Sequence, residues 1–136
     1  MTLVHIVKNW DKPDLISQTP GCNGVWGDIQ FTEEKVATCD YLVVLSCILK
    51  KLTINCKKEN IFLIFQEPYH KDTSDWITKE RHKFSKIFTH FIPTKDTKYI
   101  KSHPCVPWHV RKTYDELVKY TVPEKSKAIS CITSNK

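Results

Sequence analysis

An unbroken apolar run at residues 61–65, with the sequence I-F-L-I-F, constrains the fold of this 136-residue chain more than any other feature. A strand that is apolar at every position is buried on both faces, which is typical of a parallel sheet covered by helices. Pro68 cannot donate to a sheet ladder, so the strand should end beside Glu67. Because ligands of open α/β sheets collect beyond the carboxyl ends of the strands, we expect Glu67 at the rim of a crevice, where a general base would lie. Taken alone, such a segment more often presents a carboxylate that caps a helix or pairs with a lysine.

Four further short apolar segments predict the same architecture. They lie at residues 3–7, 41–45, 86–91 and 128–132, and several are continuous rather than alternating. The sequence therefore predicts an α/β fold with a Rossmann-like, largely parallel sheet that is flanked by helices. The length, with 40% apolar and 26% charged residues, indicates a single packed domain.

Two helices are predicted from capping residues and apolar spacing. Asp75 can cap a helix that runs to about Phe84. A Thr-x-x-Glu capping box at residues 113–116 opens a second helix, in which Leu117 and Tyr120 should face inward.

Three other segments are harder to assign. Residues 33–38 form a short third helix candidate. Residues 9–31 and 102–110 carry few regular signals. The first segment has two prolines, two tryptophans and all three glycines, and the second has two prolines beside Trp108 and two histidines. Long irregular loops inside compact domains are usually functional, so we expect binding residues in them.

The charge of the chain suggests a polyanion partner but does not establish one. Lysines give most of the formal net charge of +6, and only Arg81 and Arg111 supply guanidinium groups. Specific phosphate and base recognition usually relies on the guanidinium fork, so a solvated lysine-rich face is favoured over a nucleic-acid interface. No apolar stretch approaches the ~20 residues that span a bilayer, and no signal-peptide pattern begins the chain. We therefore expect a cytoplasmic protein or one at the membrane periphery.

The cysteines are expected to be reduced, and most of them should be small core residues. No pair has the C-x-x-C spacing of zinc and redox sites. The six are Cys22, Cys39, Cys47, Cys56, Cys105 and Cys131.

His103, Cys105 and His109 have metal-ligand side chains at tight spacing. Pro107 makes a continuous helix through them unfavourable, so the two histidines are not placed on one helix face. We therefore predict no metal here, and Trp108 is more plausibly an apolar platform. Glycine-rich phosphate-binding motifs are absent from the sequence, which has three glycines.

Several segments, in order along the whole chain, resemble the N-terminal half of family 10 glycosyltransferases, the α-1,3-fucosyltransferases, and their bacterial-type branch most closely. The segments are N-W-D-K-P-D-L at residues 9–15, Q-T-P-G-C-N-G-V-W at 18–26, I-Q-F-T at 29–32, C-D-Y-L-V-V-L at 39–45, E-N-I-F-L-I-F-Q-E-P at 59–68 and S-H-P-C-V-P-W-H-V at 102–110.

The resemblance implies a GT-B architecture of two Rossmann-like domains. Residues 1–127 would form the acceptor-side domain, and residues 128–136 would begin the domain that binds GDP-fucose, the donor substrate. Glu67 would be the catalytic base that deprotonates the acceptor hydroxyl, and no cofactor or metal would be required in this domain. Two residues depart from the family pattern, namely Ser46, where asparagine is expected, and Cys131, where tryptophan is usual.

A lactosamine-like glycan is the acceptor that the resemblance implies. Its contacts should come from Gln18, Trp26, Tyr69, His70, His103 and Trp108. The chain would be an acceptor-binding half whose missing partner is a C-terminal donor domain. The alternatives are a glycan-binding fragment without transferase activity, a lysine-rich polyanion-binding domain and a non-functional remnant.

Overall fold

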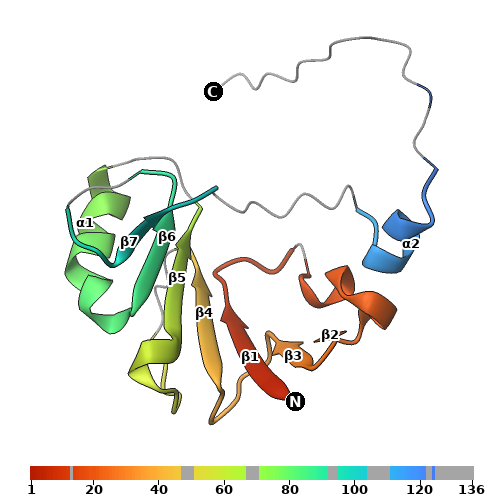
Figure 1. Cartoon of the computed structure of the whole chain (residues 1–136), viewed down its shortest axis with the longest axis horizontal. Coiled ribbons are helices and arrows are strands. Elements are labelled where there is room, and N and C mark those ends of the chain that lie inside the picture. The colour runs from red at the N-terminus through yellow and green to blue at the C-terminus, as the bar shows by residue number, and fades with distance from the viewer. Residues whose placement is uncertain are drawn as a thin grey trace.

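The protein folds around a seven-stranded sheet in which the strands run parallel except at one edge (Figure 1). The computed structural model describes residues 1–12, 14–46, 51–66, 71–91, 95–103, 111–121 and 124. Within them the strand order is β2-β3-β1-β4-β5-β6-β7, and only the β2–β3 pair is antiparallel. The strands are β1 (Thr2–Val7), β2 (Val25–Trp26), β3 (Ile29–Thr32), β4 (Tyr41–Leu45), β5 (Ile61–Phe65), β6 (Lys86–Thr89) and β7 (Tyr99–Lys101). The prediction of an α/β fold with a largely parallel sheet is confirmed.

The core lies on one face of the central strands. Val44 of β4 is in register with Leu63 of β5, which is in register with Ile87 of β6, and all three are buried. Residues in register on neighbouring strands point to the same face, and here that face packs against Ile77 of α1 (Lys71–Glu80). Burial of about five such aliphatic side chains, at roughly 1.5–3 kcal/mol each, is the main stabilisation of this half of the sheet.

The opposite face of the same strands carries a row of aromatic rings. Tyr41, Phe62 and Phe88 follow one another across β4, β5 and β6, with ring centroids 6.0 and 6.3 Å apart. Phe62 and Phe88 are half-buried and Tyr41 is exposed. The continuous apolar runs in the sequence therefore reflect two apolar faces, but the second face is less buried than predicted.

Four predicted strands are found close to their expected bounds. Residues 3–7, 41–45 and 61–65 correspond to β1, β4 and β5, and β6 ends two residues before the predicted end at residue 91. The predicted strand at 128–132 lies outside the described residues.

The helix predictions need three corrections. Helix α1 begins at Lys71, so Asp75 lies inside it and is not its cap, and the helix passes into a 3₁₀ turn, η4 (Arg81–Lys83). Residues 33–38 are not helical, because Thr38 forms a parallel bridge with Asn55 that holds this backbone extended.

The capping box is present, and it opens the short helix α2 (Tyr114–Val118). Thr113 Oγ1 accepts from the amide of Glu116, and a Glu116 carboxylate oxygen accepts from the amide of Thr113 at 2.7 Å. These bonds lower the pKa of Glu116. Tyr120 does not face inward as predicted, since it is 52% exposed and lies 5.0 Å from the ammonium of Lys112.

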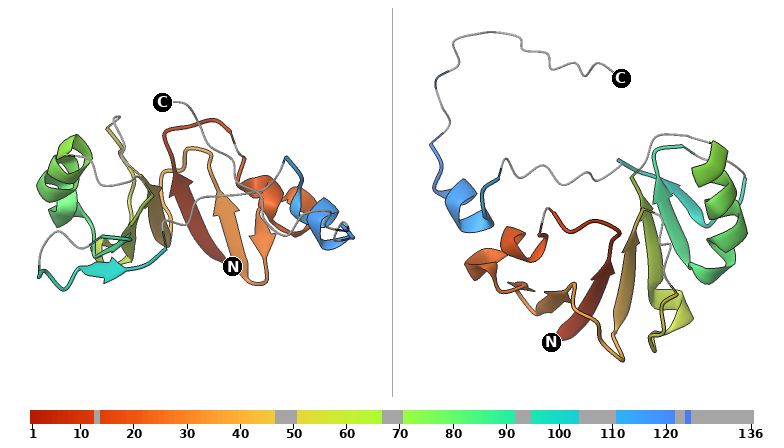
Figure 2. Two further views of the ribbon diagram at one scale, coloured as in Figure 1. Left: turned by 90° about the horizontal axis from the view of Figure 1, so that it is seen from above. Right: turned by 180° about the vertical axis from the view of Figure 1, so that it is seen from behind.

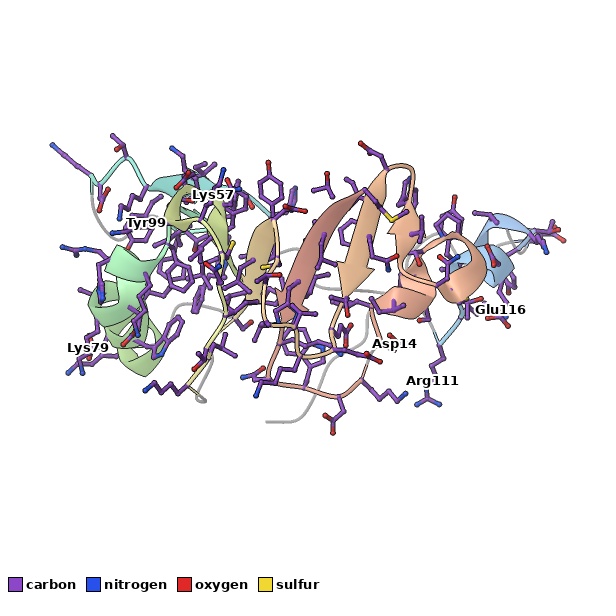
Figure 3. All side chains as sticks on the ribbon, turned by 90° about the horizontal axis from the view of Figure 1, so that it is seen from below. Asp14, Lys57, Lys79, Tyr99, Arg111 and Glu116 are labelled. Atoms are coloured by element: carbon purple, nitrogen blue, oxygen red, sulfur yellow. The ribbon has the colours of Figure 1, made fainter. Side chains whose placement is uncertain are left out.

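The helices gather at opposite ends of the sheet. Helix α1 lies beside β6 and β7, whereas α2 packs against the 3₁₀ turns η1 (Ile16–Gln18) and η2 (Pro20–Cys22) at the β2–β3 end (Figure 2). Figure 3 shows this separation, with Tyr99 and Lys79 at one end and Asp14 and Glu116 at the other. A fourth 3₁₀ turn, η3 (Lys58–Asn60), leads into β5.

The strand order reverses between β1 and β4. From β1 the chain moves outward to β3, returns across β1 to β4, and then adds β5, β6 and β7 in sequence order. Loops that follow the two strands at such a reversal diverge to opposite sides and leave a crevice between them. The fold therefore places its topological switch point at the carboxyl ends of β1 and β4.

Candidate functional site

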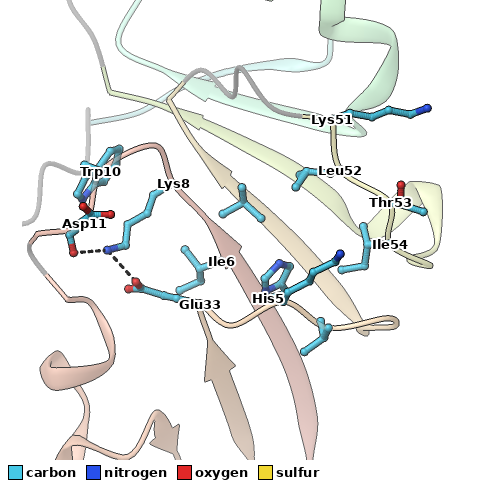
Figure 4. Close-up of a pocket in the computed structure, with 13 residues that line it drawn as sticks. His5, Ile6, Lys8, Trp10, Asp11, Glu33, Lys51, Leu52, Thr53 and Ile54 are labelled. Atoms are coloured by element: carbon cyan, nitrogen blue, oxygen red, sulfur yellow. Dashed lines mark hydrogen bonds and ion pairs between the residues drawn. The ribbon is translucent and has the colours of Figure 1, made fainter.

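A pocket of about 600 Å³ lies at this switch point. Its walls come from the segment after β1, the segment after β3 and the connection between β4 and β5. A volume of this size suits a small-molecule ligand. We refer to it as the switch-point pocket; its side chains are seen in Figure 4, and the residues used below are His5, Lys8, Trp10, Asp11, Glu33, Lys35, Val36 and residues 51–54.

An ion pair joins two of these walls. Lys8 Nζ lies 2.7 Å from a carboxylate oxygen of Glu33 and donates to the backbone oxygen of Asp11 at 3.2 Å (Figure 4). The other carboxylate oxygen of Glu33 accepts from the amide of Leu15 at 2.8 Å. The Lys8 side chain is 6% exposed and that of Glu33 22%, so the pair is largely desolvated and fixes the end of β1 against the end of β3.

His5 supplies a neutral imidazole to the floor of the pocket. The ring is buried on β1, and its Nδ1 lies 3.3 Å from the carbonyl oxygen of Thr32. Burial lowers the pKa of His5, against the opposing effect of the hydrogen bond to Thr32. An Nδ1–H that donates to this carbonyl leaves Nε2 as an acceptor, which can receive a hydrogen bond from a hydroxyl.

Trp10 borders the pocket on the side of the β1 loop (Figure 4). Its indole Nε1 is buried and has no hydrogen-bond partner among the described residues. A buried N–H donor normally has an acceptor, and a hydroxyl or carboxylate oxygen of a ligand would complete it. The pocket thus combines an aromatic surface with donors and acceptors, which is the usual composition of a small-molecule site.

The carboxyl ends of β4 and β5 are tied together. Ser46 follows β4 with a φ of 58°, is buried, and donates its amide to the carbonyl oxygen of Ile64 at 2.9 Å. Its hydroxyl lies 3.4 Å from the side-chain oxygen of Gln66. These contacts position the residue that directly precedes Glu67 at the carboxyl edge of the sheet.

Two of the predicted acceptor residues lie away from the switch-point pocket. Gln18 donates to the backbone oxygen of Lys112 at 2.9 Å and so joins η1 to the segment before α2. Trp26 is on the edge strand β2, is 49% exposed, and packs edge-to-face on Tyr114 with ring centroids 4.9 Å apart. Neither side chain lines the pocket.

The remaining predicted residues are not brought to this place by the described part of the chain. His103 is exposed and follows β7, at the other edge of the sheet from Trp26. Seven strands spaced by roughly 4.8 Å put the two edges about 29 Å apart, so these two side chains do not share one small site. Glu67, Tyr69, His70 and Trp108 lie outside the described residues.

Sequence reasoning missed the side chains that form the pocket. Trp10 and Asp11 belong to the N-W-D motif of the long loop at residues 9–31, which was expected to be functional but not assigned a role. That motif was the available signal. His5 and Lys35 carry no such signal, because nothing local in the sequence brings β1 beside the chain after β3.

No metal site emerges from the described residues, in which no group of three or more His, Cys, Asp or Glu side chains is placed to hold an ion. Among the same residues, helices of membrane-spanning length and apolarity are not found. Comparisons of the chain with protein-family models, with curated proteins and with solved structures found no match.

Proposed function

We propose that this chain is the acceptor-binding half of an inverting fucosyltransferase, which moves fucose from GDP-fucose to a hydroxyl of a lactosamine-like glycan. The observation that carries the proposal is the location of the pocket at the switch point of a parallel sheet. Ligands of open α/β domains bind at this point. A GT-B architecture, with a second domain that binds the donor, is part of the proposal.

Glu67 is the proposed general base. It directly follows Gln66 at the end of β5, and β5 neighbours β4, the strand that lies beside β1 at the switch point. In an inverting transfer the carboxylate accepts the proton of the acceptor hydroxyl while that oxygen attacks the anomeric carbon and GDP leaves. The left-handed φ of Ser46 also favours the proposal, because asparagine, expected there from the resemblance, adopts this conformation more readily than serine.

The acceptor is proposed to bind in the switch-point pocket, with the Trp10 ring as its platform. Lys8, Asp11 and Glu33 place charged groups around the ring, and His5 adds an acceptor. Charged and polar side chains beside an aromatic face match the alternating hydroxyls and apolar C–H faces of a hexose. Trp26, which was expected from the sequence to contact the acceptor, is the rival tryptophan.

A binding and transfer experiment with two tryptophan variants tests the proposal. Binding of N-acetyllactosamine to the 136-residue chain is measured by ligand-observed NMR for the wild type and for Trp10→Ala, Trp26→Ala and Glu67→Gln. Fucose transfer from GDP-fucose is measured for the chain joined to whatever coding sequence follows residue 136, with and without Glu67→Gln.

We expect Trp10→Ala to weaken binding at least about tenfold, as loss of one stacked ring should, and Trp26→Ala to leave it unchanged. Glu67→Gln should preserve binding and lower transfer by about 10²–10⁴-fold. Binding without transfer in the joined wild type would favour the glycan-binding fragment. Binding of any polyanion that falls steeply with salt, without selectivity for the glycan, would refute the proposal.

A further inference from the structure

Two free cysteines lie side by side where the backbone of residues 37–39 pairs with that of residue 55. Thr38 and Asn55 form a parallel bridge. The amide of Asn55 donates to the carbonyl oxygen of Ala37 at 2.9 Å, and the amide of Cys39 donates to the carbonyl oxygen of Asn55 at 3.2 Å. Cys39 and Cys56 each follow one member of the bridged pair, so they occupy neighbouring positions of one short ladder.

The side chains of this cysteine pair point to the same side. Both are half-buried and pack against the same hydrophobic core cluster. Cys56 contributes to the raised pKa of Cys39, so the two thiols are close enough to interact. The sulfur of Cys56 also lies 3.6–3.8 Å from the carbonyl oxygens of Asp40, Lys57 and Asn60.

This arrangement meets the geometric demands of a disulfide. Neighbouring strands are about 4.8 Å apart, and bridged cysteines usually have Cα atoms 4.4–6.8 Å apart. Side chains in register on one face need only rotate about their χ1 bonds to bring the two sulfurs together. The backbone hydrogen bonds at Asn55 hold the two segments in place while this happens.

We propose that Cys39 and Cys56 form a reversible disulfide by exchange with a low-molecular-weight disulfide, and that this bond clamps two walls of the switch-point pocket. The thiolate of Cys56 attacks one sulfur of the small disulfide, forms a mixed disulfide and releases one small thiol. Cys39 then loses its proton, its thiolate attacks the sulfur of Cys56, and the second small thiol leaves. The two cysteines are oxidised by two electrons, the small disulfide is reduced to two thiols, and both protons end on those thiols.

The order of the two steps follows from the surroundings of Cys39. Burial, followed by the contact with Cys56, raises the pKa of Cys39 to about 11. Cys39 is therefore protonated at neutral pH and does not make the first attack, because the thiolate is the nucleophile. Its deprotonation limits the second step.

The pocket walls are the elements that the bond would restrain. Lys35 and Val36 line the pocket from the chain just before Cys39, and residues 51–54 line it from the chain just before Cys56. In the reduced protein these walls are joined by the backbone bonds at Asn55. A covalent link at the same place would reduce their opening relative to each other.

The test is oxidation of the folded 136-residue chain in a glutathione buffer. After acid quenching and alkylation of free thiols, digestion and fragmentation mass spectrometry locate any cystine. We expect a peptide pair that joins Cys39 to Cys56 and lacks two hydrogen atoms, in the wild type and in the Cys22→Ser control, whose cysteine is exposed. Cys39→Ser should stop at the glutathione adduct of Cys56.

Two further readouts separate this proposal from incidental oxidation. Closure of the mixed disulfide should accelerate about tenfold per pH unit between pH 7 and 9, because it depends on the thiolate of Cys39. Amide hydrogen exchange in residues 51–56 should slow at least about tenfold on oxidation. A folded wild type, native by circular dichroism, that forms no Cys39–Cys56 cystine would overturn the proposal, and unchanged exchange in the oxidised protein would overturn the clamp.

Discussion

Breaking the Lys8–Glu33 ion pair should destabilise the fold far more than breaking an exposed pair. Lys8→Met keeps the length of the side chain but leaves the carboxylate of Glu33, which is 22% exposed, without its cation. Glu33→Gln keeps the bond from the amide of Leu15 but removes the negative charge that lies 2.7 Å from the ammonium of Lys8, which is 6% exposed. Each change therefore leaves one poorly solvated charge at the wall of the pocket.

The expected loss of unfolding free energy lies between the values measured for buried and for surface ion pairs. Removal of one partner from a buried pair costs about 3–5 kcal/mol, whereas an exposed pair contributes about 0–1 kcal/mol. The partial exposure of Glu33 and its remaining hydrogen bond reduce the cost, so we expect a loss of about 2 kcal/mol for each single variant. The double variant should lose about 2.5 kcal/mol, which corresponds to a coupling energy of about 1.5 kcal/mol.

Urea unfolding of the four proteins, followed by far-UV circular dichroism, gives this coupling energy. The matched control is Lys83→Met, which breaks the i,i+3 pair with Glu80 at the end of α1, where the lysine side chain is 60% exposed. The control should lose less than about 0.5 kcal/mol. A coupling energy below about 0.5 kcal/mol for Lys8 and Glu33, with unchanged urea slopes, would show that the pair does not hold the two walls together.

Two other predictions concern backbone strain and pH. Gly24 has a φ of +78°, and a Cβ there would lie 2.5 Å from the carbonyl oxygen of Phe31, so Gly24→Ala should lose about 3 kcal/mol. Gly27→Ala is the control in urea unfolding. Its φ is +63°, but no described atom lies within 4 Å of the Cβ, so it should lose about 1 kcal/mol of stability. Equal losses for the two variants would refute the close approach at Gly24. Since burial lowers the pKa of His5 below its ordinary 6.5, the unfolded chain binds a proton that the folded chain does not, and stability should fall as pH decreases through the lowered pKa. The urea midpoint of the wild type should therefore fall relative to that of His5→Gln, so that the gap between the two midpoints narrows from pH 7 to pH 5. A gap that stays constant would contradict this.

The central strands could be predicted because their signal is local. In β4 and β5 every residue is apolar, and a dense apolar run of five residues has few other structures in a chain of this size. The edge strands were missed for the opposite reason. β2 has two residues and β7 has three, too few for an alternating pattern to stand out.

The start of α1 was misplaced because residue types that favour N-caps also occur inside this helix. Residues 72–75 read D-T-S-D, and each of these residue types is a good N-cap, yet α1 begins at Lys71 and contains all four. The cap-type residues in the sequence therefore did not mark the start of the helix. The capping box at Thr113 and Glu116 was unambiguous, because it requires two residues at a fixed spacing, and it was found as predicted.

The candidate site was expected beside Glu67, and the described residues that line the pocket were not predicted as site residues. A crevice at the carboxyl edge of a parallel sheet is the expectation from fold class alone. Glu67, which was expected at its rim, lies outside the described residues, and the pocket is lined by β1, by the segments after β1 and β3 and by residues 51–54. The identity of its walls depends on strand order. Strand order brings together residues such as His5 and Ile54, which are far apart in the sequence. No local sequence pattern indicates that they are neighbours in the fold.

The segment that sequence reasoning assigned wrongly, residues 33–38, is the one that forms a wall of the pocket. Its path is set at both ends by partners from elsewhere in the chain. Glu33 is held by Lys8 and by the amide of Leu15, and the backbone around Thr38 is held by Asn55. Because the local sequence does not determine this path, a change in either set of partners should move the same wall. The Lys8–Glu33 ion pair restrains one end of this wall, and the proposed Cys39–Cys56 bond would restrain the other. Changing each of them separately tests whether residues 33–38 move as a single unit.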